Sequence, residues 1–260
     1  MAALFQLSPP TRGQCMTFPS IAFMRFLRKL HKWLGLIVGI QMVLWTVSGL
    51  MFALLDHHEV TPEHHAPPTP ALASGSTIAE PAQWLDAYAG KELYDIRLMS
   101  LLDQWVWRVE TSGGVDLRRA EDGKPFAIDA RVAERLARSH YQGEGKLSNV
   151  AFHASSRMEA RDAGAVWAAR FDDARNTTVY FAANDGGWVA TRNSTWRVFD
   201  FFWMLHTMDY KGRDDFNNPL VITVATATLW LSISGVILLT RSFRPRPVTA
   251  SKLSPARTEF

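Results

Sequence analysis

Residues 33–55 read WLGLIVGIQMVLWTVSGLMFALL, and this stretch contains no charged side chain. A second uncharged run, PLVITVATATLWLSISGVILLT, covers residues 219–240. An α-helix of about 20 apolar residues is long enough to cross the hydrocarbon core of a bilayer. The sequence therefore predicts two transmembrane helices, at 33–55 and 219–240, with a long polar segment between them.

A cleaved signal peptide is the alternative interpretation of the first run. Signal peptides have an apolar core of about 7 to 15 residues, followed by a cleavage site of the small-x-small type. The first run is longer than that, and its end, Met51–Leu55, offers no such site. We therefore expect this segment to remain as a membrane anchor.

The charges that flank the two runs predict the orientation of the protein. Basic residues precede the first run and follow the second, whereas acidic residues follow the first: Arg25, Arg28, Lys29, Lys32, Arg241, Arg244 and Arg246 against Asp56, Glu59 and Glu63. By the positive-inside rule, residues 1–32 and 241–260 are cytoplasmic and residues 56–218 lie outside. The expected location is a bacterial inner membrane with a periplasmic main domain. The net charge of +3 is largely this topological signal, so we expect no nucleic-acid partner.

The outer segment divides into a linker and two folded units. Residues 56–76 combine a histidine-rich stretch, DHHEVTPEHH, with a tether rich in Pro, Ala and Ser. A helical pattern at 78–90 followed by alternating strands predicts one helix-plus-antiparallel-sheet unit over 77–130. A second helical pattern followed by strands, the last of them WVATR at 188–192, predicts another unit over 131–194. Residues 195–218 are expected to form an interfacial helix and turn. The predicted fold class is thus a membrane α+β protein, with two transmembrane helices flanking an extracytoplasmic domain.

The two units share a sequence pattern. VDLRRAEDGKPFAI (115–128) and TVYFAANDGGWVAT (178–191) align without gaps at an offset of 63 residues, and both contain A-x-D-G. An internal repeat explains the match. Chance similarity is the alternative, because A-x-D-G is common turn chemistry.

Several kinds of chemistry lack support in the sequence. Cys15 is the only cysteine, so the outer segment can form no internal disulfide, and no C-x-x-C-H motif is present to attach a c-type haem. The sequence also has no phosphate-binding loop, dinucleotide fingerprint or G-x-S-x-G motif. Neither hydrolysis nor soluble redox catalysis is indicated.

His31 stands at the mouth of the first apolar run, with Gly35 and Gly39 one and two helical turns further along. In a helix the three residues share one stripe. One interpretation is a packing groove, because G-x-x-x-G lets a neighbouring helix approach the backbone. The other is a flat macrocycle that lies over the glycines, with His31 as the axial ligand.

His206 ends the aromatic run WRVFDFFWMLH, which suits a helix at the outer membrane surface. It is either an incidental histidine in an aromatic belt or a haem ligand. His57 follows His31 by about 39 Å along a straight helix, so the two would lie at opposite faces of the membrane. A haem with two histidine ligands from one chain is therefore expected only at the outer face, from His206 with His57 or His58.

Two polar segments have open interpretations. Four histidines in the juxtamembrane stretch could weakly bind Zn, Cu or Fe, or could simply be solvated: His57, His58, His64 and His65. The segment DYKGRDDFNN, residues 209–218, is either a surface turn or a place where Arg213, Asp214 and Asp215 hold propionates or a partner.

Three segments carry a family resemblance. RKLHKWLGLIVGIQMVLWTVSGL (28–50), FFWMLHTMDYKGRDDFNNPLVI (201–222) and WLSISGVILL (230–239) resemble PepSY-associated transmembrane proteins, and the outer pattern with its D-G turns resembles the PepSY domain. Larger relatives with four spans include membrane reductases thought to carry haem and to reduce iron in siderophores. Other PepSY domains are linked to protease inhibition.

For this two-span chain, the resemblance implies an electron-transfer subunit for periplasmic reduction rather than a self-contained reductase. It also implies a b-type haem near His31, Gly35, Gly39, His57 or His206. The expected partner is a second copy of the chain or a membrane redox protein. The alternative is a non-enzymatic, membrane-anchored PepSY module that binds or regulates a partner.

Overall fold

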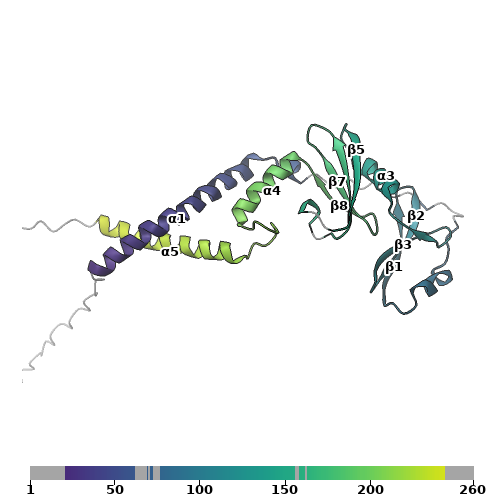
Figure 1. Ribbon diagram of the computed structural model, residues 1–260, viewed down its shortest axis with the longest axis horizontal. Helices are drawn as coiled ribbons and strands as arrows, with labels where there is room; N and C mark the ends of the chain where they lie inside the picture. Colours follow the sequence, from purple (N-terminus) through teal and green to yellow (C-terminus); the bar gives the residue numbers. More distant parts are fainter. Residues whose placement is uncertain are drawn as a thin grey trace, which may run out of the picture. The chain divides into compact units, whose positions relative to one another are not determined.

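The structure is a computed structural model that describes residues 21–61, 69, 71–72, 77–155, 158–161 and 163–243 (Figure 1). The chain divides into two compact units. The helical unit consists of Met1–Leu44 and Asn217–Phe260, and the sheet unit is Trp45–Phe216. Helix α1 has residues in both units.

Two helices are long and apolar enough to cross a membrane: α1 (Ile21–Leu54) and α5 (Pro219–Ser242). α1 begins well before the first uncharged run, so the basic residues that precede this run lie on the helix itself. At the start of α5, the Asn218 side chain accepts the N–H of Val221 at 3.0 Å, and Pro219 is the first helical residue. This arrangement satisfies one of the N–H groups that a helix leaves free at its start.

Most of the apolar surface of the two helices is not covered by protein. Only 11% of the most apolar window of α1 and 6% of that of α5 is buried. Leu36, Ile37 and Ile233 are examples of large apolar side chains that are more than half exposed. The core helix of a soluble protein would be buried, whereas a helix with this exposed apolar surface requires lipid around it.

The sheet unit contains two antiparallel sheets of four strands. The first has the order β1 (Leu93–Leu101), β2 (Gln104–Thr111), β3 (Gly114–Arg119), β4 (Pro125–Phe126). The second has the order β5 (Lys146–His153), β6 (Val166–Asp172), β7 (Thr178–Ala182), β8 (Trp188–Arg192). Three further helices complete the unit: α2 (His57–Val60), α3 (Ala130–His140) and α4 (Ser194–Thr207). These elements agree with the predicted α+β class.

α3 lies between the two sheets and joins their cores (Figure 1). The carboxylate of Asp129 caps its start by accepting the N–H of Val132 at 2.9 Å. Small residues on α3 let strands from both sheets pack closely against it, so one hydrophobic core extends across the unit. Phe171 and Phe181 are the largest fully buried side chains of this core.

The helix predicted within residues 78–90 is not a regular α-helix. The structure has two short 3₁₀ segments instead, η1 (Pro81–Gln83) and η2 (Leu85–Tyr88), separated by Trp84 with a non-helical φ of −133°. Trp84 and Tyr88 are both buried in a small cluster with Val109 of β2. Packing of these two rings on the sheet determines the local backbone, and helical propensity does not.

The two sheets repeat the same turn geometry at the same sequence offset. Gly123 and Gly186 both have a left-handed backbone, with φ of 69° and 70°. The N–H of Gly123 donates to the carbonyl of Arg119 at 3.0 Å, and the N–H of Gly186 donates to that of Ala182 at 2.9 Å. Only glycine adopts such a backbone without strain. The shared hydrogen bonds favour an internal repeat over chance similarity.

We expect Phe181→Ala to lower the free energy of unfolding of the sheet unit by about 3–5 kcal/mol, because it leaves a cavity in the shared core. Phe152→Ala is the matched control, because Phe152 lies on β5, the edge strand of the same sheet, and is 51% exposed. Urea unfolding of the full chain in detergent, followed by tryptophan fluorescence, measures both. Equal effects of the two substitutions would contradict the single-core description.

Candidate functional site

His31 lies on α1 and faces α5 within the helical unit. Its Nδ1 is 2.7 Å from the hydroxyl oxygen of Ser234. A Cβ placed on Gly235 would lie 3.4 Å from Cε1 of His31, so the glycine leaves the space that the imidazole ring occupies. The structure thus holds His31 by one ring nitrogen, against a helix surface of small residues.

Ser234 has a second possible hydrogen-bond partner, in its own helix. Its hydroxyl oxygen lies 3.0 Å from the carbonyl of Leu231. A hydroxyl has one proton, so when Ser234 donates to Leu231 its oxygen accepts from Nδ1 of His31, which then carries the imidazole proton. In that tautomer the lone pair is on Nε2, for which no residue in the described part of the chain provides a hydrogen bond.

A groove runs along α1 and α5 beside His31. It has a volume of about 290 Å³ and is lined by His31, Gly35, Val38, Gly39, Met42, Thr228, Leu231 and Ser232. An ideal Cβ on Gly39 would meet nothing within 4 Å, whereas one on Gly35 would lie 3.9 Å from Leu231. The predicted stripe of His31, Gly35 and Gly39 thus lines one groove: Gly35 is close to α5, and Gly39 faces open space.

His206 is held in the same way within the sheet unit. Its Nδ1 is 2.8 Å from the hydroxyl oxygen of Ser48 on α1, and that hydroxyl donates to the carbonyl of Trp45 at 3.1 Å. Trp45 in turn donates its indole N–H to the backbone carbonyl of His206 at 2.8 Å. When Ser48 donates to Trp45 in this way, its oxygen accepts from Nδ1 and the lone pair of His206 is on Nε2.

Aromatic rings surround His206. Phe52 of α1 presents its edge to the imidazole, with ring centroids 5.3 Å apart, and it also packs against Phe199 at 5.0 Å. Phe199 and Trp203 stack at 5.7 Å along α4. The aromatic stripe expected from the sequence therefore packs against α1 and forms an apolar wall beside the histidine.

The polar segment after α4 forms a compact turn. Asp209 accepts backbone N–H groups from Lys211, Gly212, Asp214 and Asp215. The hydrogen bond from Asp215, together with the other three, lowers the pKa of Asp209 to about 2. This geometry favours the interpretation of the segment as a structural turn.

Arg213 is part of this turn. Its guanidinium pairs with buried Asp200 of α4, and its carbonyl accepts the indole N–H of Trp203 at 2.9 Å. The arginine that the sequence offered as a partner for propionates is thus already bound to a carboxylate within the chain.

The other predicted ligands are not gathered around either histidine. His57 and His58 are exposed on α2, and His64 and His65 lie outside the described residues. Within the described part of the chain there is no group of three or more His, Cys, Asp or Glu suited to a metal ion. Metal binding by the juxtamembrane histidines, and pairing of His57 or His58 with His206, stay predictions. His31 and His206 belong to different units, so the structure defines two separate sites.

Sequence reasoning missed Ser48 and Ser234, although both spans contain a signal. Each serine is followed by glycine, in VSGL at 47–50 and ISGV at 233–236. Ser48 is 0% and Ser234 3% exposed, which is unusual for a polar side chain on such apolar helices. The shared S-G pair marks the place on each span that faces a histidine.

Comparison with known proteins identifies a family for this chain. A family model described as the PepSY-associated TM region matches residues 28–259. No curated protein and no solved structure matches the chain. Because the match spans nearly the whole chain and includes both histidine-bearing segments, this membrane protein belongs to the family of PepSY-associated transmembrane proteins.

Proposed function

We propose that the chain is a haem-bearing subunit that carries electrons across the inner membrane for reduction in the periplasm. The observation that carries the proposal is the pair of serine-held histidines, His31 with Ser234 and His206 with Ser48. A histidine that ligates a metal usually donates its other ring N–H to a fixed acceptor, which orients the ring and selects the tautomer. Both histidines have a serine oxygen in the position of that acceptor.

The residues around His31 fit a flat, apolar macrocycle. The groove has His31 in its lining and open space over Gly39, with apolar side chains such as Val38 and Met42 along it. A bound b-type haem would supply one-electron transfer. Ser234 would hold the imidazole proton at Nδ1, and Gly235 would keep the ring upright against α5.

The residues around His206 fit the same kind of group. Phe52 packs against the imidazole and Phe199 packs against Phe52, and Trp45 binds the backbone carbonyl of His206 from α1. Each site takes one histidine from the described chain. A second copy of the chain or a membrane redox protein is the expected partner, which agrees with the small-residue faces of both spans.

The first test is the visible spectrum of the full chain purified from haem-replete cells. We expect Soret and α bands that shift on reduction by dithionite. His206→Ala should remove or strongly weaken one low-spin signal, and His31→Ala should affect a different one.

His140→Ala is the control for these variants, because His140 binds the carbonyl of Leu136 within the sheet unit and should leave the spectrum unchanged. A colourless protein, or full spectra in both variants, would remove the only cofactor from the proposal. The non-enzymatic, membrane-anchored PepSY module would then be the function.

The second test concerns the serines. Ser234→Ala and Ser48→Ala each remove the acceptor for a histidine Nδ1–H, so we expect haem affinity at the corresponding site to fall about 10- to 100-fold. Thr240→Ala is the matched control, because Thr240 makes the same bond to its own helix, to Ile237, without any histidine.

Haem content per chain and the electron paramagnetic resonance of the low-spin iron measure the effect of these substitutions. Because a change in imidazole orientation alters the resonance even at full occupancy, the second readout separates positioning from packing. Unchanged resonance and haem content in both serine variants would refute the positioning role.

The third test concerns orientation, which the flanking charges predict. An alkaline phosphatase fusion placed after residue 72 should be active, and one placed after residue 243 should be inactive, because that enzyme folds only outside the cytoplasm. A cytoplasmic reporter at the same two positions serves as the control and should give the opposite pattern. If the phosphatase is active only at residue 243, both termini are outside and the proposed direction of electron flow is wrong.

A further inference from the structure

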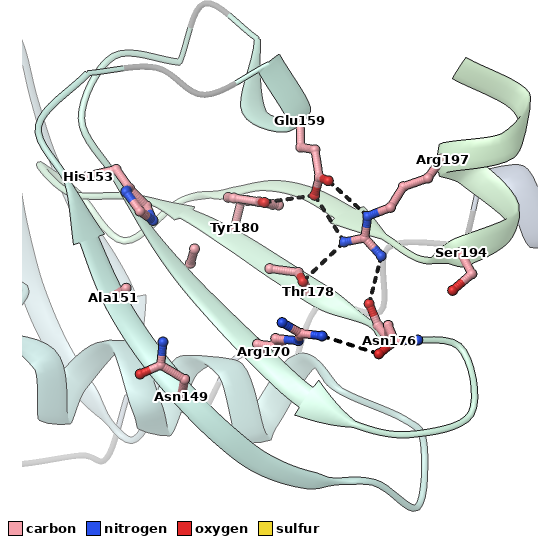
Figure 2. Close-up of a pocket in the computed structure, with 11 residues that line it drawn as sticks. Asn149, Ala151, His153, Glu159, Arg170, Asn176, Thr178, Tyr180, Ser194 and Arg197 are labelled. Atoms are coloured by element: carbon pink, nitrogen blue, oxygen red, sulfur yellow. Dashed lines mark hydrogen bonds and ion pairs between the residues drawn. The ribbon is translucent and has the colours of Figure 1, made fainter. Parts of the chain in front are cut away.

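A polar pocket lies on the face of the second sheet that α3 does not cover (Figure 2). Its volume is about 630 Å³, which is within the range of about 300–1,000 Å³ typical of small-molecule sites. Strands β5, β6 and β7 form its floor, and residues of η3 (Met158–Ala160) and of the first turns of α4 form one side. None of its residues belongs to the histidine sites described above.

The strand register arranges the floor in rows. Ala151, Ala168 and Tyr180 are cross-strand neighbours, and the two alanines make a small apolar surface in the middle of the pocket. Asn149, Arg170 and Thr178 form the adjacent row, which is polar. A ligand seated here would have an apolar body over the alanines and a polar group against the second row.

The carboxylate in the pocket already has its partners. Glu159 accepts both Nε and Nη2 of Arg197, at 2.8 and 3.1 Å, and the hydroxyl of Tyr180 at 2.8 Å. Burial alone would raise the pKa of Glu159, but the hydrogen bonds from Arg197 and Tyr180 outweigh it and the pKa lies below its usual value. Glu159 and Arg197 thus cancel each other's charge.

Arg170 also lines the pocket, and it takes no part in the ion pair of Glu159 and Arg197. Its guanidinium makes one hydrogen bond, from Nη2 to the side-chain oxygen of Asn176 at 3.2 Å. Among the described residues, no carboxylate lies within 4.0 Å of it, and no partner contacts the amide of its row neighbour Asn149. Figure 2 shows Arg170 between Asn149 and Asn176 at one end of the pocket. The unused hydrogen-bonding groups at this end of the pocket are mainly N–H donors.

We infer that this pocket binds a monocarboxylate, with the carboxylate on Arg170 and Asn149 and an apolar group over Ala151 and Ala168. A guanidinium presents two parallel N–H groups, which match the two oxygens of a carboxylate. A phosphate would also fit the fork, but its second charge would need a second free cation. Arg197 is paired with Glu159, so Arg170 is the one arginine among the described lining residues that has no carboxylate partner.

Fluorine NMR of fluorobenzoate, titrated with the full chain in detergent, tests the inference. We expect saturable broadening of the ligand signal, and Arg170→Gln should weaken the affinity about tenfold or more, because it removes a charge-assisted bidentate contact. Ala151→Leu should abolish binding, because the leucine side chain fills the space above the apolar floor without changing any charge. Arg97→Gln is the matched control, because Arg97 is an exposed strand arginine of the other sheet.

Competing ligands identify the chemistry and its source. Displacement by a tripeptide with a free C-terminus, but not by its amidated form, would support a peptide carboxylate as the natural ligand; no displacement by either would support a small organic acid. Fluorobenzamide binding as tightly as fluorobenzoate, tighter binding of fluorophenyl phosphate, or unchanged affinity in Arg170→Gln would overturn the inference. So would the absence of binding by both fluorobenzoate and the free peptide. None of these results depends on haem, so they are separate from the test of the proposed function.

Discussion

A serine hydroxyl has one proton, and the geometry of both histidine sites depends on where that proton goes. Ser48 and Ser234 each lie within hydrogen-bond distance of a carbonyl of their own helix, three residues earlier. When the serine donates to that carbonyl, its oxygen accepts the Nδ1–H of the histidine opposite, and the lone pair is on Nε2. When the serine turns its proton toward the histidine, the lone pair is on Nδ1 and Nε2 carries hydrogen. The competition between the helical carbonyl and the histidine for one proton therefore determines which imidazole nitrogen can bind a metal.

The same constraint explains why small residues accompany the serines. A serine reaches a histidine on a neighbouring helix only if the two backbones are close, and in membranes small side chains allow that approach. Gly235 shows the consequence directly, because a Cβ there would lie 3.4 Å from the ring of His31. Near His206 the contact is of a different kind. There α1 meets α4 through Phe52 and Trp45, whose large rings pack beside the histidine.

The sequence predicted those parts of the fold that local patterns encode. The uncharged runs predicted both spans, and the period-two alternation predicted strands such as Trp188–Arg192. It did not predict the 3₁₀ form of the segment around Trp84, because burial of two rings against β2 overrides the helical pattern there. For the site, the spacing of His31, Gly35 and Gly39 predicted a shared stripe. The partners Ser48 and Ser234 depend on contacts between residues 158 and 203 positions apart, which no local pattern reveals.

α4 connects two features of the sheet unit that no sequence pattern associates. Arg197, in its first turns, contacts Glu159 at the edge of the polar pocket, and His206, near its end, binds Ser48. Nine residues separate them, which is about 14 Å along one straight helix. A rigid helix transmits a displacement only when it has two discrete positions, and a ligand selects between them only by binding one better than the other. Any influence of a carboxylate in the pocket on His206 would therefore require a shift of α4 as a body, and by linkage the state of His206 would alter the affinity of the pocket by the same factor.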